Sequence, residues 1–216
     1  MKIVFSLVLF FSIITLVEAD EVIVTQTTTP YEVVELSGIS SKQTHLGELS
    51  KYPIMYGFTL TETDVLETQL RQVNNVGEPV PFRLLLIKEN AQGRGVEEVF
   101  RFNPTSDDWV KTKDKSLGLT FWESESVSYS LEPGVYRMEV STPENIGKYA
   151  LLLGDTEKSV GYFTSLKQAR FTQDFFGYSV FRMLAVAPVY YTLGIIFLLM
   201  LIYKTRKYSS LITKNA

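Results

Sequence analysis

The chain of 216 residues contains no cysteine and only one histidine, His45. The absence of cysteine excludes disulfides, thiol nucleophiles and zinc sites built from cysteine and histidine. A serine triad would have to use His45, and the nearby Ser40 and Ser41 stand too close in sequence to indicate a designed pair. No Gly-x-Ser-x-Gly motif is present. We therefore expect His45 to be a turn residue and not a catalytic base.

Positive charge is scarce over most of the chain. Residues 20–182 hold 16 lysines and arginines against 23 aspartates and glutamates, a net charge of −7. Because nucleic-acid binding depends on clustered cations that neutralise phosphates, this balance argues against a nucleic-acid partner. Residues 204–216 are the opposite, with four basic residues and no acidic one.

Long apolar runs occur at both ends of the chain. Residues 1–19 combine Lys2, an apolar run and a small residue at Ala19, a pattern typical of a cleaved signal peptide; the alternative is an uncleaved membrane anchor. Residues 183–203 carry no charge, and 21 helical residues would span about 31 Å, close to the hydrocarbon thickness of a bilayer. We expect this helix to begin near Met183 and to contain Pro188 within its first turns.

These features predict five segments. They are a signal peptide at 1–19, an extracytoplasmic domain at 20–161, a juxtamembrane helical connector at 162–182, a transmembrane helix at 183–203 and a cytoplasmic basic tail at 204–216. A cleaved signal puts the N-terminal domain outside, and the basic tail is consistent with the cytoplasmic side. The predicted location is the plasma membrane, with a single span whose helix contacts the lipid bilayer.

Apolar residues alternate with polar ones through most of residues 20–161, as expected for half-buried strands. The predicted strands lie at 21–28, 31–36, 53–60, 65–73, 81–89, 96–102, 119–131, 134–140 and 148–154, with turn residues between them. Residues 63–73 also suit a helix by propensity, but their valines and neighbours favour a strand. The predicted fold class is all-β: an antiparallel, jelly-roll-like β-sandwich followed by one transmembrane α-helix.

Two blocks of sequence resemble bacterial pre-peptidase C-terminal-like domains, which are small jelly-roll sandwiches on secreted and surface proteins. The first block resembles the opening of that family through His45, Gly47, Glu48, Leu49, Tyr56 and Phe58. The second, Glu132 to Asp155, resembles its closing hairpin through Gly134, Tyr136, Gly147, Tyr149, Leu151 and Gly154. The resemblance implies a non-catalytic surface module, as in uncharacterised bacterial single-pass proteins of the same layout.

The residues of the second block also support a hairpin on physical grounds. Gly134 follows a proline, which suits a type II turn with a positive φ. Gly147 and Gly154 suit further turn or bulge positions. Tyr136 and Tyr149 would then form a cross-strand aromatic pair, so we expect this block to close the fold.

Candidate chemical groups are few. The carboxylates gather as Glu62 with Asp64, Asp107 with Asp108, and Glu123 with Glu125, and we expect them to be solvated. A calcium site in the turn at 107–108 is conceivable. Trp109, Phe121 and Trp122 would form an aromatic patch if exposed, but we expect at least two of them in the core. The sequence thus predicts no catalytic, metal or cofactor-binding residue and no cofactor.

The resulting functional prediction is a non-catalytic, membrane-anchored cell-surface interaction module with a protein or polysaccharide partner. Two alternatives remain: an accessory subunit that acts in a membrane complex through its helix, and a carboxylate-based surface hydrolase. The connector at 162–182 is predicted to be a helix that runs into the span, with Phe171 and Phe175 in contact with lipid.

Overall fold

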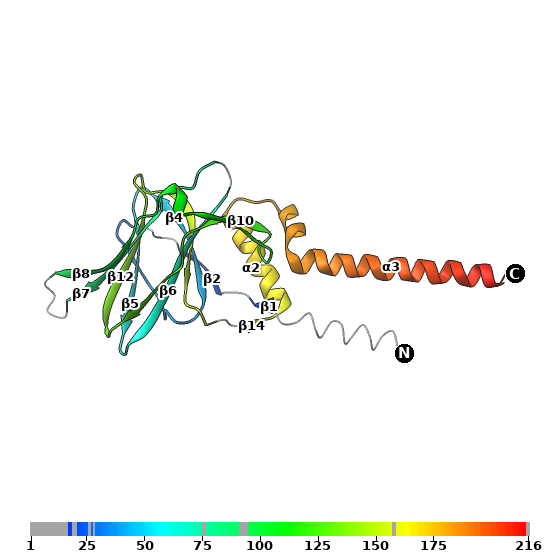
Figure 1. The fold of residues 1–216 in the computed structure, drawn as a ribbon, viewed down its shortest axis with the longest axis horizontal. Helices are drawn as coiled ribbons and strands as arrows, with labels where there is room; N and C mark the ends of the chain where they lie inside the picture. The colour runs from blue at the N-terminus through cyan, green and yellow to red at the C-terminus, as the bar shows by residue number, and fades with distance from the viewer. Residues whose placement is uncertain are drawn as a thin grey trace.

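The computed structural model of the chain describes residues 17–18, 21–25, 27, 29–74, 77–90, 95–156 and 159–214. Two β-sheets pack into a sandwich, and one long helix, α3, projects from one side of it (Figure 1). The predicted β-sandwich followed by an apolar C-terminal helix is confirmed. Most of the predicted signal peptide, residues 1–16 and 19, lies outside the described residues.

The elements follow one another in a simple order. The strands are β1 (Val17–Glu18), β2 (Glu21–Thr25), β3 (Val33–Glu35), β4 (Gln43–Ser50), β5 (Ile54–Leu60), β6 (Asp64–Val73), β7 (Arg83–Glu89), β8 (Val96–Phe102), β9 (Val110–Asp114), β10 (Leu119–Glu123), β11 (Val127–Leu131), β12 (Gly134–Ser141), β13 (Ile146–Leu153) and β14 (Ser159–Val160). The helices are the 3₁₀-helix η1 (Ser106–Asp108), α2 (Tyr162–Phe175), the 3₁₀-helix η2 (Val180–Ala185) and α3 (Ala187–Lys214).

The larger sheet has seven strands in the order β2-β4-β13-β6-β10-β9, with β11 also paired to β6. The smaller sheet has five strands in the order β3-β5-β12-β7-β8. Both sheets are mixed, because β2 pairs with β4 and β3 with β5 in parallel, whereas the sequence predicts antiparallel pairing alone. The short strands β1 and β14 form a separate antiparallel pair.

Strand β6 shows how the alternating pattern produces the core. Leu66 and Leu70 are buried on one face, together with Thr68 and Gln72, while the residues between them are partly exposed. A period of two is the periodicity of a strand and not of a helix. The prediction of a strand for this segment is confirmed.

The predicted closing hairpin is wrong, because β12 and β13 belong to different sheets. Tyr136 on β12 stacks on Phe58 with ring centroids 5.3 Å apart, whereas the Tyr149 hydroxyl on β13 lies 2.9 Å from that of Tyr56 in the facing sheet. The two tyrosines of the motif therefore fill two places in the core and do not pair across neighbouring strands. The chain crosses from one sheet to the other between them.

The glycines of this block also differ in their roles. Gly147 and Gly154 adopt positive φ angles of +131° and +72°, as predicted for turn or bulge positions. Gly134 does not have a positive φ; a Cβ atom there would lie 2.7 Å from Cε of the flexible Lys88 side chain. The predicted type II turn at Gly134 is therefore wrong.

Strand β4 contains the segment that the sequence predicts as an opening turn, and it lies between β2 and β13 inside the larger sheet. Its residues Gln43 to Gly47 are all buried, because both faces of this sheet are covered. Burial on both faces removes the alternation by which a strand is recognised. The polar residues at its start make the segment resemble a turn in sequence.

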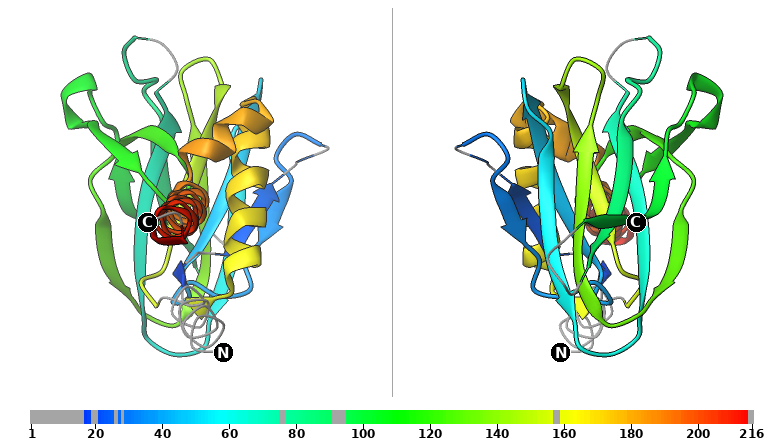
Figure 2. Two further views of the ribbon diagram at one scale, coloured as in Figure 1. Left: turned by 90° about the vertical axis from the view of Figure 1, so that its right-hand side faces the viewer. Right: turned by 90° about the vertical axis from the view of Figure 1, so that its left-hand side faces the viewer.

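Helix α2 forms a third layer, lying against the outer face of the larger sheet (Figure 2). It ends at Phe175, and Gly177 with a φ of +80° separates it from η2. The connector is thus two elements and not one helix continuous with the span, which corrects the prediction. Ser165, Ala169 and Thr172 of α2 are buried, and this side of the helix faces the sheet.

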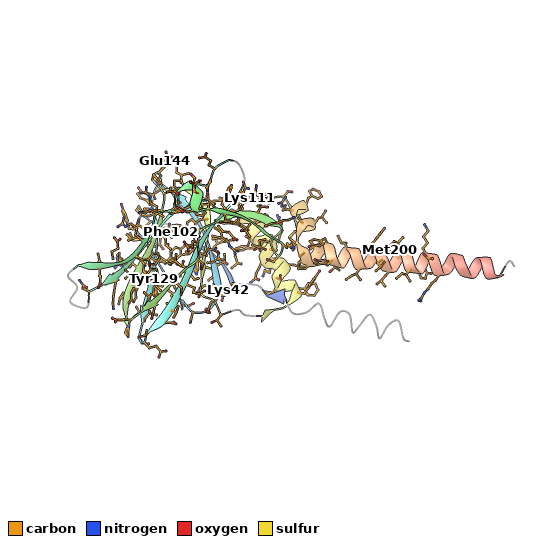
Figure 3. The ribbon with its side chains drawn as sticks, viewed as in Figure 1. Lys42, Phe102, Lys111, Tyr129, Glu144 and Met200 are labelled. Carbon is orange, nitrogen blue, oxygen red and sulfur yellow. The ribbon has the colours of Figure 1, made fainter. Side chains whose placement is uncertain are left out.

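Helix α3 has the length and composition of a membrane span over Ala187–Arg206, a stretch of 20 residues with a mean hydropathy of 1.6 and no burial inside the molecule. Figure 3 places Met200 far from the sandwich along this helix. Pro188 lies in its first turn, where no helical hydrogen bond is lost, and the helix begins four residues after the predicted Met183. The segment boundaries at 183–203 and 204–216 remain predictions.

Candidate functional site

His45 lies in the interior of β4, 2% exposed, and not in a turn. Its Nε2 lies 3.0 Å from Gln43 Oε1 and its Nδ1 3.5 Å from Thr25 Oγ1, so both ring nitrogens face polar neighbours in the core. Burial lowers the pKa of His45 to about 4, because the charged imidazolium loses its hydration. A buried, neutral histidine of this kind supports the fold.

The predicted carboxylate clusters lie in separate parts of the molecule. Asp108 accepts hydrogen bonds from the backbone N and Oγ1 of Thr105, which hold the pKa of its carboxyl below the usual range. Asp64 accepts from the backbone N of Val65 at the start of β6. Among the residues that the structure describes, no three His, Cys, Asp or Glu side chains gather into a group that would hold a metal ion.

The tryptophans and the nearby phenylalanine are mostly internal. Trp109 and Phe121 are buried, as predicted for at least two of the three aromatic residues. Trp122 is half-buried, and Lys111 Nζ lies 5.8 Å from the centroid of its ring. These rings therefore form no exposed aromatic patch.

An exposed aromatic pair lies elsewhere, at one end of the sandwich. The ring centroids of Tyr31 and Tyr52 are 6.1 Å apart, and both side chains are exposed. Tyr31, Lys51 and Asn145 are the described non-glycine residues with positive φ, and the Lys51 backbone N donates to Asn145 O at 2.9 Å. A bulky residue in this conformation is strained, so Tyr31 itself has a strained backbone and Tyr52 follows directly after another strained residue, Lys51.

A partly open cavity of about 300 Å³, with a mixed polar and apolar lining, lies between helix α2 and the larger sheet. Its polar lining comes from both layers: Lys42, Thr44, Arg71 and Asp114 from the sheet side, and Gln168 and Thr172 from the helix. Oγ1 of Thr172 and Oε1 of Gln168 are buried without a hydrogen-bond partner. A cavity of this size and polarity can hold ordered water or a small hydroxylated molecule.

Two residues of the cavity lining, Arg71 and Asp114, belong to a charge group that also includes Glu123. Arg71 Nε lies 2.8 Å from Glu123 Oε1, and its Nη1 lies 3.6 Å from Asp114 Oδ2. The first pair is close but not aligned as a hydrogen bond, so it acts through charge. Glu123, which the sequence analysis expects to be solvated, is instead half-buried beside Arg71.

The turn between β9 and β10 connects the sandwich to the three C-terminal helices. Oδ1 of Asp114 shapes the turn by accepting from the backbone N and Oγ of Ser116 and from the backbone N of Leu117. Three carbonyls of the turn then accept hydrogen bonds from three different helices. They are Leu117 O from Gln173 Nε2 at 2.7 Å, Gly118 O from Arg182 Nε at 2.8 Å and Lys115 O from Ala187 N at 2.7 Å. We call residues 114–118 the socket turn.

A second set of contacts joins α2 directly to α3. The Tyr162 hydroxyl lies 3.0 Å from Thr192 Oγ1 and 3.3 Å from Pro188 O. At the other end of α2, Lys148 of β13 donates to Phe175 O at 2.8 Å. The start of α3 is thus held from the sheet and from α2 together.

Sequence reasoning did not identify the socket turn or the cavity. The order Asp114, Ser116, Gly118 is a local turn signal, since an aspartate accepts from the backbone two residues later and Gly118 has a φ of +65°. That signal marks a turn but not its partners, which come from residues more than fifty positions further along the chain.

No protein-family model matches this chain, and no curated protein matches it. Among solved structures, the pre-peptidase C-terminal domain of a collagenase from Bacillus anthracis is similar to it. The identity is 14%, the TM-score is 0.36, and the match covers 61% of this chain and 100% of the other. This is the domain type that residues 132–155 resemble in sequence. At this TM-score the likeness says nothing about ligand, partner or activity.

Proposed function

We propose that this chain is a membrane-anchored, non-catalytic surface module whose sandwich is held in a fixed orientation by the socket turn. In this proposal residues 1–19 are a cleaved signal and residues 20–161 lie outside. The span lies within the predicted 183–203 and begins with α3 at Ala187, and the tail 204–216 is cytoplasmic. The observation that carries the proposal is the set of three socket-turn carbonyls that bind α2, η2 and α3. A domain on a flexible tether would need no such contacts.

The candidate chemical groups support a binding role over a hydrolytic one. His45 is buried and has its pKa lowered, and Asp108 caps a local turn. Glu123 is paired with Arg71 beside the cavity. A carboxylate hydrolase needs two acids that flank one bond, whereas the two acids beside the cavity, Asp114 and Glu123, both lie against Arg71.

The proposed partner contact is the exposed end of the sandwich around Tyr31 and Tyr52. Tyrosine is enriched where proteins bind other molecules, because a rigid ring covers a large area at a low cost in conformational entropy. The strained backbone that presents this pair is a further reason to assign it a role in binding a protein or a polysaccharide.

The absence of cysteine allows a direct test of orientation. Single cysteines in place of Glu144, which is exposed on the sandwich, and of Ser209, in the predicted tail, are treated with a membrane-impermeant maleimide on intact cells. We expect Glu144→Cys to react at once and Ser209→Cys to react only after permeabilisation. The reverse pattern would overturn the proposed topology.

A second experiment separates the sandwich from the helix as the binding element. The full-length protein is cross-linked on cells and purified in detergent, alongside a version in which residues 187–203 are replaced by an unrelated apolar span. Partners that survive the replacement but are lost in the double variant Tyr31→Ser, Tyr52→Ser support the proposal. Val96→Ser, exposed on β8, is the matched control. Partners lost with the span alone would favour an accessory subunit.

A further inference from the structure

Four apolar side chains are exposed on the side of the sandwich from which α3 leaves. Phe163 at the start of α2 is 83% exposed, and Val180, Phe181 and Leu184 of η2 are 60%, 77% and 57% exposed. Large apolar side chains gathered on one exposed side indicate contact with a partner or a membrane. We call these four residues the collar.

The collar lies level with the start of α3. The Tyr162 hydroxyl bonds to Thr192, which places the first turn of α2, and Phe163 with it, beside the first turns of α3. η2 ends at Ala185, directly before α3 begins at Ala187. Figures 1 and 2 show η2 and the start of α2 at the base of α3. The 17 uncharged residues from Ala187 to Tyr203 rise about 25 Å, most of the hydrocarbon thickness, which puts Ala187 near its boundary.

Charge on the same side is opposite in sign to the rest of the domain. Residues 110–118 and 162–185 carry six cations, Lys111, Lys113, Lys115, Lys167, Arg170 and Arg182, and two acids, Asp114 and Asp174. Residues 20–182 as a whole have a net charge of −7. Lys113, Lys115 and Lys167 are exposed, while Arg170 pairs with Asp174 and Arg182 binds Gly118 O. Figure 3 shows Lys111 on the strands next to η2 and Tyr129 further from α3.

We propose that the collar inserts into the interfacial layer of the bilayer around α3, with Lys115 and Lys167 facing anionic headgroups. The inference rests on the proposed membrane anchoring by α3 and adds the surface by which the sandwich itself meets the lipid. Aromatic and aliphatic side chains favour the boundary between headgroups and acyl chains, and lysines favour an anionic surface. The residues that contact lipid are thus Phe163 and Phe181 and not Phe175, which packs on the sandwich beside Phe176.

The test uses nitroxide labels on single cysteines in the full-length protein, reconstituted in vesicles of phosphatidylcholine with phosphatidylglycerol. Labels replace Phe163 and Phe181 in the collar, Ile196 within α3 and Val96 on β8, all of which are exposed side chains. Relaxation by oxygen, which concentrates in lipid, is compared with relaxation by a water-soluble nickel complex. We expect lipid contact at both collar positions, at a shallower depth than Ile196, and full water exposure at Val96.

The outcomes separate the two proposals. Water exposure at Phe163 and Phe181 with Ile196 in lipid would overturn the collar and leave the anchoring by α3 intact. Water exposure at Ile196 would overturn both. In vesicles of phosphatidylcholine alone, and in the variant with Lys115→Gln and Lys167→Gln, we expect the collar labels to become more accessible to nickel. Unchanged accessibility in both would overturn the assignment of anionic headgroups.

Discussion

Three buried tyrosines have hydroxyls that bond inside the sandwich. The hydroxyls of Tyr56 and Tyr149 lie 2.9 Å apart and join the two sheets, and Tyr136 donates to Glu132 O at 2.7 Å. Burial raises the pKa of Tyr56 to about 12, so its hydroxyl stays protonated at all ordinary pH values. Each ring therefore contributes apolar packing without leaving its polar atom unpaired.

Replacement of Tyr136 by alanine should destabilise the sandwich. Tyr136 is buried and stacked on Phe58, and loss of a buried aromatic side chain costs about 3–5 kcal/mol. Tyr136→Phe keeps the ring and loses one hydrogen bond, so we expect a loss of only about 1 kcal/mol. Urea unfolding of both variants measures the difference. Equal stabilities of Tyr136→Ala and the native protein would contradict the packing of this residue.

His45 should make the stability of the sandwich depend on pH. The folded pKa of about 4 lies below the ordinary value of 6.5, so the unfolded chain takes up a proton first as the pH falls. Stability is thus complete above about pH 6.5 and falls between 6.5 and 4, with a loss of about 2 kcal/mol from pH 7 to pH 5. Urea unfolding at both pH values measures this loss.

His45→Gln is the matched variant, since the amide cannot take up a proton in this range. It should lower stability at pH 7 but show a much smaller loss between pH 7 and pH 5. Because the chain has no other histidine, the difference between the two proteins reports this one group. An identical pH dependence in both would show that His45 is solvated in the fold.

At the scale of elements, the socket turn is the part of the structure through which the sheet and the C-terminal helices meet. Gly118 is central to it, because its φ is +65° and a Cβ atom there would lie 3.0 Å from the carbonyl carbon of Ala185 and 3.1 Å from Val186 N. Glycine is therefore required both by the backbone conformation and by the close approach of η2. The two requirements are separable by mutation.

Gly118→Ala should weaken the attachment of α3, and Gly77→Ala provides the matched control. Gly77 has a similar φ of +69°, but nothing lies within 4 Å of its Cβ position. Both variants should lose about 1–2 kcal/mol from the left-handed backbone. Only Gly118→Ala should speed hydrogen exchange at the amide of Ala187, which donates to Lys115 O. Equal exchange rates in the two variants would contradict the close contact.

At the scale of the whole molecule, the sandwich, α2 and the start of α3 form one connected body. The socket turn contacts α3 at Ala187, and Tyr162 contacts it at Pro188 and Thr192. In the proposed membrane-anchored arrangement, a rigid junction would limit the swing of the domain and keep its exposed tyrosines at a constant height and angle above the membrane. Such restriction would favour one approach direction for the proposed partner.

The restricted swing is measurable by time-resolved anisotropy of a dye on Glu144→Cys in the reconstituted full-length protein. We expect a small amplitude of independent motion in the native chain, because the junction is hydrogen bonded on two sides. A Gly-Ser insertion after Val186 should increase that amplitude strongly, since it separates η2 from α3 and displaces Ala187 N from Lys115 O. The same insertion after Glu62, in the exposed turn between β5 and β6, should leave it unchanged. Large motion in the native chain would show a flexible tether.

Local sequence alone determined the features that depend on the period of apolar residues. The strands from β5 to β8, the strand character of β6 and the apolar helix near the C-terminus all follow from that period, because each element buries a face of its own geometry. The glycines at 147 and 154 were also predictable, since turns need positive φ. These are properties that neighbouring residues set by themselves.

Tertiary structure alone decided which elements meet. Strand β4 escaped recognition because α2 covers the outer face of its sheet and removes the alternation. Tyr136 and Tyr149 lie close in sequence but in different sheets, and their partners Phe58 and Tyr56 both come from β5, 78 and 93 residues earlier. The socket turn likewise acts only through Gln173, Arg182 and Ala187, which the fold brings to it. A local sequence pattern indicates which side chains are buried. The residues that pack against those side chains come from distant parts of the chain, so only the tertiary structure identifies them.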